Sequence, residues 1–261
     1  MTLEILTEKS ATSPKKGDIV LIHGACMGAW CWMDNFLPWF AAAGYDTHAV
    51  SLQNHGNSEK KGSLRMKSIK AYVEDLRQVV DKLQEPVHLI GHSMGGLIIQ
   101  HYLASPSPKV KKAVLLCSAF PHPDISLLPR LMRDFPWSFV KANLRMSWTP
   151  VFQNPSNARK LMLSQQFPEV RIKPLLEKMQ DESFLVFLQI MGLTPPDTRK
   201  VKTPLFIIGG EKDYLISESG TRKMAAAYGT EPWIVKNAPH NLMMEEGWER
   251  IAERISDFLR H

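Results

Sequence analysis

The stretch Leu89-Ile90-Gly91-His92-Ser93-Met94-Gly95-Gly96-Leu97 (LIGHSMGGL) places a Gly-x-Ser-x-Gly pattern directly after an apolar run. The run Val87 to Ile90 predicts a buried strand, and the residues from Gly95 to Ala104 predict a helix. Glycine and serine are also the usual residues of turns and helix starts. The stretch alone therefore leaves two readings of Ser93, a nucleophile on a sharp turn or a residue that caps a helix.

The sequence on either side of this stretch alternates between predicted strands and predicted helices. Apolar runs predict strands, and apolar residues at helical spacing predict helices. Such an alternation predicts an α/β fold with a mostly parallel, twisted sheet flanked by helices and right-handed crossovers. The expected strands are 19–22, 47–52, 87–90, 110–117, 205–208 and 233–235, and the expected helices are 29–43, 68–83, 95–104, about 217–228, and 245–259.

The alternation lapses between residues 121 and 200. This segment contains five methionines, six phenylalanines, two tryptophans and several prolines, in short helical patterns. It has 11 Lys and Arg against 7 Asp and Glu, a net charge of +4. We therefore expect a core formed by residues 1–120 and 201–261, with residues 121–200 inserted as a helical cap.

Polar residues follow several of the predicted strands. His23-Gly24-Ala25 follows the first buried strand, Ser93 follows 87–90, Asp213 follows 205–208, and His240 follows 233–235. In open parallel α/β sheets, ligands bind at the carboxyl ends of the strands. A serine, a carboxylate and a histidine are therefore expected at one edge of the sheet, in the chain order Ser, Asp, His.

This order and these contexts resemble the α/β-hydrolase superfamily over essentially the whole chain. The resemblance implies that Ser93 is the nucleophile, His240 the base and Asp213 the acid, with Glu211 as a nearby rival for the acid. In this role His240 accepts the Ser93 proton, and Asp213 orients the imidazole. The resemblance also places the oxyanion hole at two backbone N–H groups, those of Ala25 and Met94.

Other motifs narrow the kind of hydrolase. The loop HGACMGAWCW at 23–32 resembles plant methylesterases and hydroxynitrile lyases, but Asn241 stands where the lyases carry a lysine. The remaining sequence looks more like microbial esterases and like monoacylglycerol lipases or lysophospholipases. The family often has an aspartate where this chain has Ser51, in the stretch Ser51 to Ser58. A serine at 93, rather than the aspartate of haloalkane dehalogenases, favours ester cleavage.

The expected function is a serine esterase of lipase-like type that cleaves medium-chain, aromatic or lipid-monoester substrates through an acyl-enzyme. Met27 and Met243 neighbour the catalytic positions and are expected to line the substrate pocket. The alternatives are a non-catalytic receptor that uses the hydrolase pocket, and a lyase or perhydrolase of the same fold. No cofactor is expected, and no histidine pair has the spacing of a zinc site.

Composition is that of an ordinary globular protein. The 261 residues are 44% hydrophobic and 22% charged, with three cysteines. The start of the chain has no signal-peptide pattern, and no apolar run is long enough for a membrane span, so cytoplasmic residence is expected. The net charge of +6 is scattered, so no nucleic-acid partner is expected, whereas transient contact with a membrane surface is compatible with it. The expected partner is a small-molecule ester.

Overall fold

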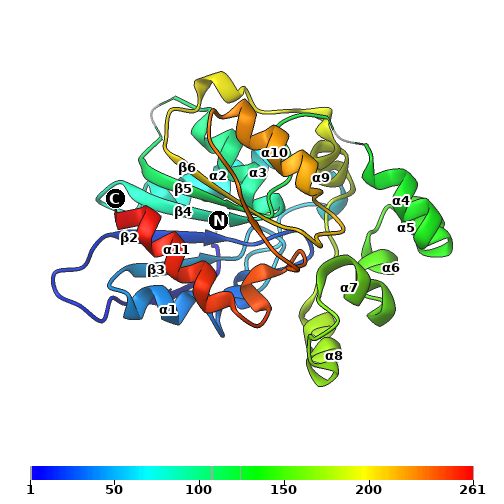
Figure 1. Cartoon of the computed structure of the whole chain (residues 1–261). Coiled ribbons are helices and arrows are strands. Elements are labelled where there is room, and N and C mark those ends of the chain that lie inside the picture. The colour runs from blue at the N-terminus through cyan, green and yellow to red at the C-terminus, as the bar shows by residue number, and fades with distance from the viewer. Residues whose placement is uncertain (1, 107, 124, 261) are drawn as a thin grey trace.

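In the computed structural model, residues 2–106, 108–123 and 125–260 are described. They form a seven-stranded sheet in the order β1-β3-β2-β4-β5-β6-β7 (Figure 1). Strand β1 runs antiparallel to β3, and the other neighbouring strands are parallel. The strands are β1 (Ile5–Glu8), β2 (Asp18–Ile22), β3 (Asp46–Val50), β4 (Val87–His92), β5 (Val110–Leu116), β6 (Leu205–Gly210) and β7 (Trp233–Val235).

Helices cover both faces of the sheet, which confirms the predicted fold class. Helices α1 (Phe36–Ala42) and α11 (Trp248–Arg260) pack on one face, where they share an apolar cluster with β2 and β5. The other face is covered by α2 (Ile69–Val80), α3 (Met94–Leu103) and α10 (Glu218–Ala227). Every residue of β2 and β4 is buried, as two covered faces require.

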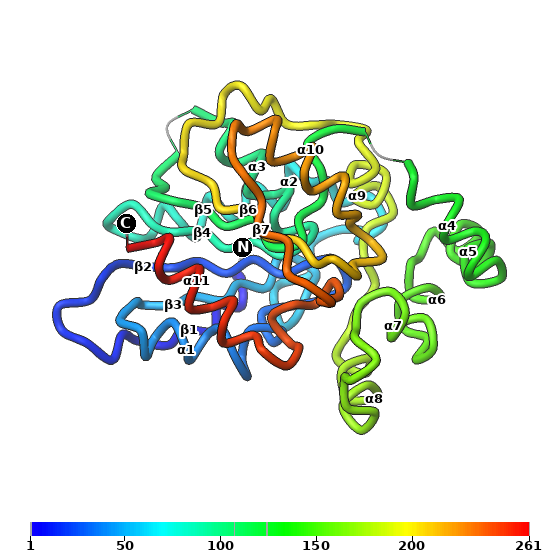
Figure 2. The backbone as a smooth tube through the Cα atoms, in the orientation of Figure 1, coloured from blue at the N-terminus to red at the C-terminus, as the bar shows by residue number. Residues whose placement is uncertain are grey.

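Further helices lie between β5 and β6, in the interval where the sequence departs from alternation. Figure 2 shows the chain leaving β5, passing through this peripheral group and returning as β6. That residues 121–200 form a separate cap domain remains a prediction. The helices are α4 (Leu127–Asp134), α5 (Pro136–Arg145), α6 (Thr149–Phe152), α7 (Pro155–Met162), α8 (Glu169–Lys178) and α9 (Phe184–Leu188), followed by a π-type turn (Gln189–Leu193) and a 3-10 turn (Thr198–Lys200).

Two expected elements differ in the structure. The helix expected over 29–43 is a 3-10 turn, Ala29–Trp32, followed by the separate helix α1. Pro38 has no N–H for the carbonyl of residue 34, so it would break the interior of a helix over 29–43, whereas it is tolerated in the first turn of α1, which begins at Phe36. The last helix begins at Trp248 rather than at residue 245, after Gly247 with φ +81°.

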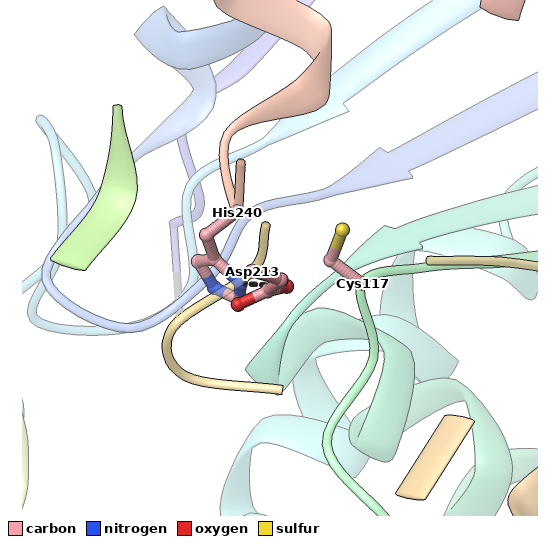
Figure 3. A group of neighbouring side chains, drawn as sticks. All are labelled: Cys117, Asp213 and His240. Carbon is pink, nitrogen blue, oxygen red and sulfur yellow. Dashed lines mark hydrogen bonds and ion pairs between the residues drawn. The ribbon is translucent and has the colours of Figure 1, made fainter. Parts of the chain in front are cut away.

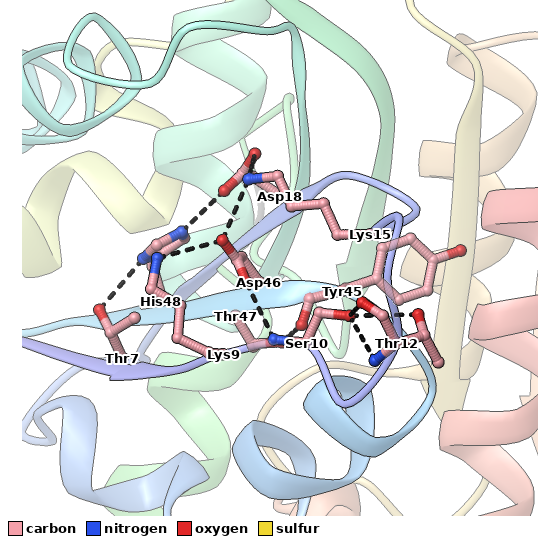
Figure 4. Close-up of polar contacts among 10 residues, drawn as sticks. All are labelled: Thr7, Lys9, Ser10, Thr12, Lys15, Asp18, Tyr45, Asp46, Thr47 and His48. Carbon is pink, nitrogen blue, oxygen red and sulfur yellow. Dashed lines mark hydrogen bonds and ion pairs between the residues drawn. The ribbon is translucent and has the colours of Figure 1, made fainter.

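The edge strand β1, which was not expected, is held by a polar network (Figure 4). Asp46 at the start of β3 accepts hydrogen bonds from the Ser10 N–H at 2.9 Å and from Lys9 and Lys15 Nζ at 3.1 and 3.0 Å. Lys15 also pairs with Asp18 at 2.8 Å. Burial alone would raise the pKa of Asp46, but these donors outweigh it and hold the pKa well below its usual value. The network thus fixes the N-terminal segment beside β2 and β3.

Candidate functional site

Ser93 lies on a strained turn between β4 and α3. Its φ of 53° and ψ of −115° are unusual for a residue with a side chain. The turn also brings the backbone of α3 close to the sheet. A Cβ on Gly95 would lie 2.4 Å from the Ile22 carbonyl oxygen, and one on Gly91 would lie 2.6 Å from Gly95. The two glycines of the pattern are therefore required by this close approach, and the Ser93 side chain makes no capping hydrogen bond to α3.

His240 and Asp213 form a buried pair at the ends of β7 and β6. The His240 Nδ1 lies 2.7 Å from Asp213 Oδ2, and Figure 3 shows the two side chains meeting. The second carboxylate oxygen, Oδ1, accepts the N–H groups of Leu215 and Ile216, both at 2.8 Å. Three N–H donors thus fix the orientation of the carboxylate. With Asp213 on Nδ1, the imidazole has Nε2 left for a second partner.

Glu211, the rival acid, has a different position. Its Oε2 accepts the backbone N–H of Asn237 at 3.0 Å, and it lies near Lys212 Nζ at 3.9 Å. It therefore braces the loop after β7 on the surface. The geometry favours Asp213 as the carboxylate that serves His240.

Cys117 lies beside this pair at the end of β5 (Figure 3). Its Sγ, a carboxylate oxygen of Asp213 and a ring nitrogen of His240 lie within 4.8 Å of one another. Burial, and then the charge of Asp213, raise the pKa of the thiol well above its ordinary value. N–H donors occupy both oxygens of Asp213. The arrangement is therefore a hydrogen-bonded group, in which Cys117 contributes a further donor to the carboxylate.

The two residues predicted to form the oxyanion hole belong to the segments that carry and adjoin Ser93. Met94 is the first residue of α3, so its N–H belongs to the turn whose amides find no acceptor inside the helix. The positive end of the helix dipole also lies there. Ala25 belongs to the loop after β2 and lines the same pocket as Ser93. This placement is suitable for binding a negatively charged oxygen next to the Ser93 hydroxyl.

The loop that contains Ala25 is held in place from two directions. Its next residue, Cys26, has φ 65°, and its carbonyl accepts the N–H of Gln180 at 2.9 Å. On the other side, the Ala29 N–H donates to Ser51 Oγ at 2.8 Å, and Ser51 in turn donates to Glu4 at 2.5 Å. Glu4, in the segment before β1, thus places a carboxylate beside Ser51, the position at which the family often has an aspartate.

A buried polar cluster joins the segment after α8 to the core. Glu182, 1% exposed, lies 3.1 Å from His55 Nε2 and accepts the Tyr72 hydroxyl at 2.8 Å. Burial alone would raise the pKa of Glu182 and lower that of His55. The opposite charges outweigh burial, so the Glu182 pKa is lowered and the His55 pKa is raised. Both groups are therefore charged together over part of the acidic range.

Two more histidines support the site without belonging to the predicted set. His23 lies 5.1 Å from the His55 ring, and burial lowers its pKa to about 3. His92 is fully buried, and its Nε2–H donates to the His240 carbonyl at 3.1 Å. Burial and then the neighbouring His240 lower the His92 pKa well below its ordinary value, so His92 is neutral. Neutral His92 fixes the backbone of His240.

One pocket brings most of the predicted residues together. Ser93, His240, Ala25 and Met27 all line it, whereas Asp213 lies behind His240. Met243 does not line the pocket: it is fully buried in the apolar core, on the 3-10 turn Leu242–Met244. The interior of the pocket holds about 50 Å³ of free volume. Its other lining residues are mostly apolar and include Phe120, Leu127, Phe152, Met162, Phe187, Ile190 and Met191.

Comparisons with known proteins agree with this fold. The model described as "Alpha/beta hydrolase family" matches residues 19–254. Methylesterase 1 of Arabidopsis thaliana is 26% identical over 245 residues, which is 88% of each chain. A monoacylglycerol lipase of Paleococcus ferrophilus superimposes with a TM-score of 0.75 at 20% identity, over 99% of this chain and 98% of that one. An esterase of Exiguobacterium antarcticum gives 0.72 at 19% identity, over 99% and 96%.

Proposed function

Because the chain belongs to the alpha/beta hydrolase family, we propose that Ser93, His240 and Asp213 cleave carboxylic esters through an acyl-enzyme. Ester hydrolysis is the activity class of its methylesterase relatives and of its esterase and lipase neighbours. The observation that carries the proposal is the placement of Ser93 on a strained turn, in one pocket with His240, whose Nδ1 is held by the buried Asp213.

Each residue has a defined part in the proposed reaction. His240 takes the Ser93 proton as the hydroxyl oxygen attacks the ester carbonyl. The N–H groups of Ala25 and Met94 bind the oxyanion, where one such donor is worth about 2.7–4 kcal/mol. His240 then gives the proton to the leaving alcohol, and water repeats the sequence to release the acid. Asp213 keeps the imidazole in the tautomer that can do this and stabilises its charged form.

The pocket favours an uncharged, apolar substrate. His92 and His240 are the titratable residues of its lining, and the rest of the wall presents methyl, thioether and aromatic groups. A charged group would lose its hydration there without gaining an ionic partner. We therefore propose medium-chain, aromatic or lipid monoesters as substrates, with α4 to α9 acting as the cap over the acyl group.

Fluorophosphonate labelling tests the proposal directly. We expect the folded protein to react at one site and the Ser93→Ala variant not to react. The same two proteins, together with His240→Ala, are then assayed on nitrophenyl esters of increasing acyl length. Loss of hydrolysis in both variants supports the triad. Folded protein that neither reacts with the probe nor turns over any ester would instead indicate a receptor that uses the pocket for binding alone.

Chain-length preference tests the substrate class. The apolar walls at Phe152, Phe187 and Met191 predict that kcat/KM rises from acetyl to octanoyl esters. Shortening one wall residue, as in Phe187→Ala, enlarges the pocket and moves the optimum toward longer chains. An optimum at acetyl esters that is insensitive to these walls would contradict the lipid and medium-chain proposal.

A further inference from the structure

The outer face of α5 is apolar where a surface helix is ordinarily polar. Trp137, Val140 and Leu144 follow one another at helical spacing and are 78%, 47% and 81% exposed. The opposite face already packs inward: Ala142 is fully buried, and the Phe139 ring lies 6.5 Å from Trp148. Trp137, Val140 and Leu144 therefore lie on the face of α5 that does not pack against the rest of the protein.

Basic residues surround this apolar stripe. Lys141 follows Trp137 by one helical turn, and Arg145 follows Lys141 by another; both are exposed. Residues 125–146 contain four Lys and Arg and one acid, a net charge of +3. That acid, Asp134, is paired with Arg133 at 2.7 Å and with Lys160 at 2.8 Å. Asp134 is therefore already engaged, and α4 and α5 contain no other acid that could neutralise Lys141 and Arg145.

We propose that this α5 surface docks on an anionic lipid surface. The α5 surface comprises Met132, Trp137, Val140, Lys141, Leu144 and Arg145. Tryptophan and leucine partition into the headgroup and acyl boundary, and lysine and arginine contact lipid phosphates. No helix formed by the described residues is long and apolar enough to cross a bilayer, so the contact is peripheral.

The charge and the position of the surface both favour lipid over a second copy of the chain. A symmetric dimer through α5 would bring Lys141 and Arg145 of the two protomers face to face, and this like charge opposes association. Figure 1 shows α4 and α5 at the edge of the molecule, away from the sheet, where a flat surface can approach them. Leu127, the first residue of α4, also lines the pocket, so docking would set the lipid next to one pocket wall.

Vesicle co-sedimentation of the full chain tests this surface without any need for catalysis, so it is independent of the proposed function. The vesicles are phosphatidylcholine alone and phosphatidylcholine mixed with phosphatidylglycerol. We expect the mixed vesicles to bind the protein in a salt-sensitive manner. The variant Trp137→Ser/Leu144→Ser should lower the partition coefficient about tenfold or more, and Lys141→Glu/Arg145→Glu should abolish the preference for mixed vesicles.

Val170→Ser is the matched control, because Val170 is 82% exposed but lies on α8, outside the α5 surface. It should bind like the unaltered protein. Circular dichroism and sedimentation velocity are recorded for every variant. Equal binding by all variants, or no binding to mixed vesicles, would overturn the proposal. A concentration-dependent dimer that Trp137→Ser/Leu144→Ser dissociates would also overturn it and assign the surface to a second copy.

Discussion

Replacing Asp213 with asparagine should invert the hydrogen bonding of His240. The Oδ1 position accepts two backbone N–H groups at 2.8 Å, so an amide nitrogen placed there would face two donors. The asparagine carbonyl therefore takes that position, and its NH2 group faces His240 Nδ1, where Oδ2 now lies 2.7 Å away. Nδ1 must then accept, and the ring proton moves to Nε2.

A histidine that carries its proton on Nε2 cannot take the proton of Ser93. The oxyanion donors and the pocket remain, so substrate binding should change little. Loss of this orientation in a Ser-His-Asp site lowers kcat by about 10⁴-fold, which corresponds to about 5 kcal/mol. We expect Asp213→Asn to show a decrease of this size, with the far-ultraviolet circular dichroism unchanged.

The assay is initial-rate hydrolysis of a nitrophenyl ester over a range of substrate concentrations, which separates kcat from KM. Glu211→Gln is the matched control, because it makes the same change at the neighbouring acid that braces the loop through Asn237. It should keep the activity of the unaltered protein. The reasoning fails if Asp213→Asn retains more than about a tenth of kcat, or if Glu211→Gln shows the larger loss.

Three further predictions concern stability and reactivity. Glu182→Gln should lower the free energy of unfolding by about 3–5 kcal/mol, measured in urea. The Glu182 pKa is lowered and the His55 pKa is raised, so the loss of stability should be greatest between pH 4.5 and 6.5, the ordinary pKa values of the two groups. The loss should shrink at more acidic and at more alkaline pH. A loss that does not depend on pH would contradict the ion pair. Gly95→Ala should lower the free energy of unfolding by about 1–3 kcal/mol and reduce activity, because the added Cβ would lie 2.4 Å from the Ile22 carbonyl oxygen. An unchanged midpoint of urea unfolding would contradict this contact. Burial raises the pKa of all three cysteines, Cys26, Cys31 and Cys117. No thiol should therefore react rapidly with Ellman's reagent at pH 8 until the protein is unfolded. A fast stoichiometric reaction of the native protein would contradict this prediction, because it would show an accessible thiolate.

The parallel core could be predicted because its signals are local. Runs such as Ile19–Ile22 are apolar on both faces, and a strand with both faces covered needs that composition. The turn at Ser93 could also be predicted, since the glycines at 91 and 95 are required by the contacts of that turn. Strand β1 escaped prediction because it is a four-residue edge strand, half-exposed, whose position depends on bonds to the distant Asp46.

The supporting residues of the site were missed for the same reason. Glu182 and His55 are 127 positions apart, and neither lies in a local pattern that indicates a buried pair. Cys117 and Gln180 act through contacts that only the folded chain creates, one with Asp213 and one with the Cys26 carbonyl. Met243 was expected at the pocket from its nearness to His240 in sequence, but the turn Leu242–Met244 directs its side chain into the core.

The contact between Gln180 and the loop after β2 has a consequence for protein engineering. The segment that includes Gln180 and Glu182 belongs to the part of the chain between β5 and β6, yet it supports the loop beside Ser93 through Cys26 and the buried His55. A chimaera that received this whole segment from a relative would change the support of that loop. It would also lose the buried carboxylate that pairs with His55, unless Glu182 and His55 were transferred together. The bond from Gln180 to Cys26 joins two backbone groups, so it does not depend on either side chain.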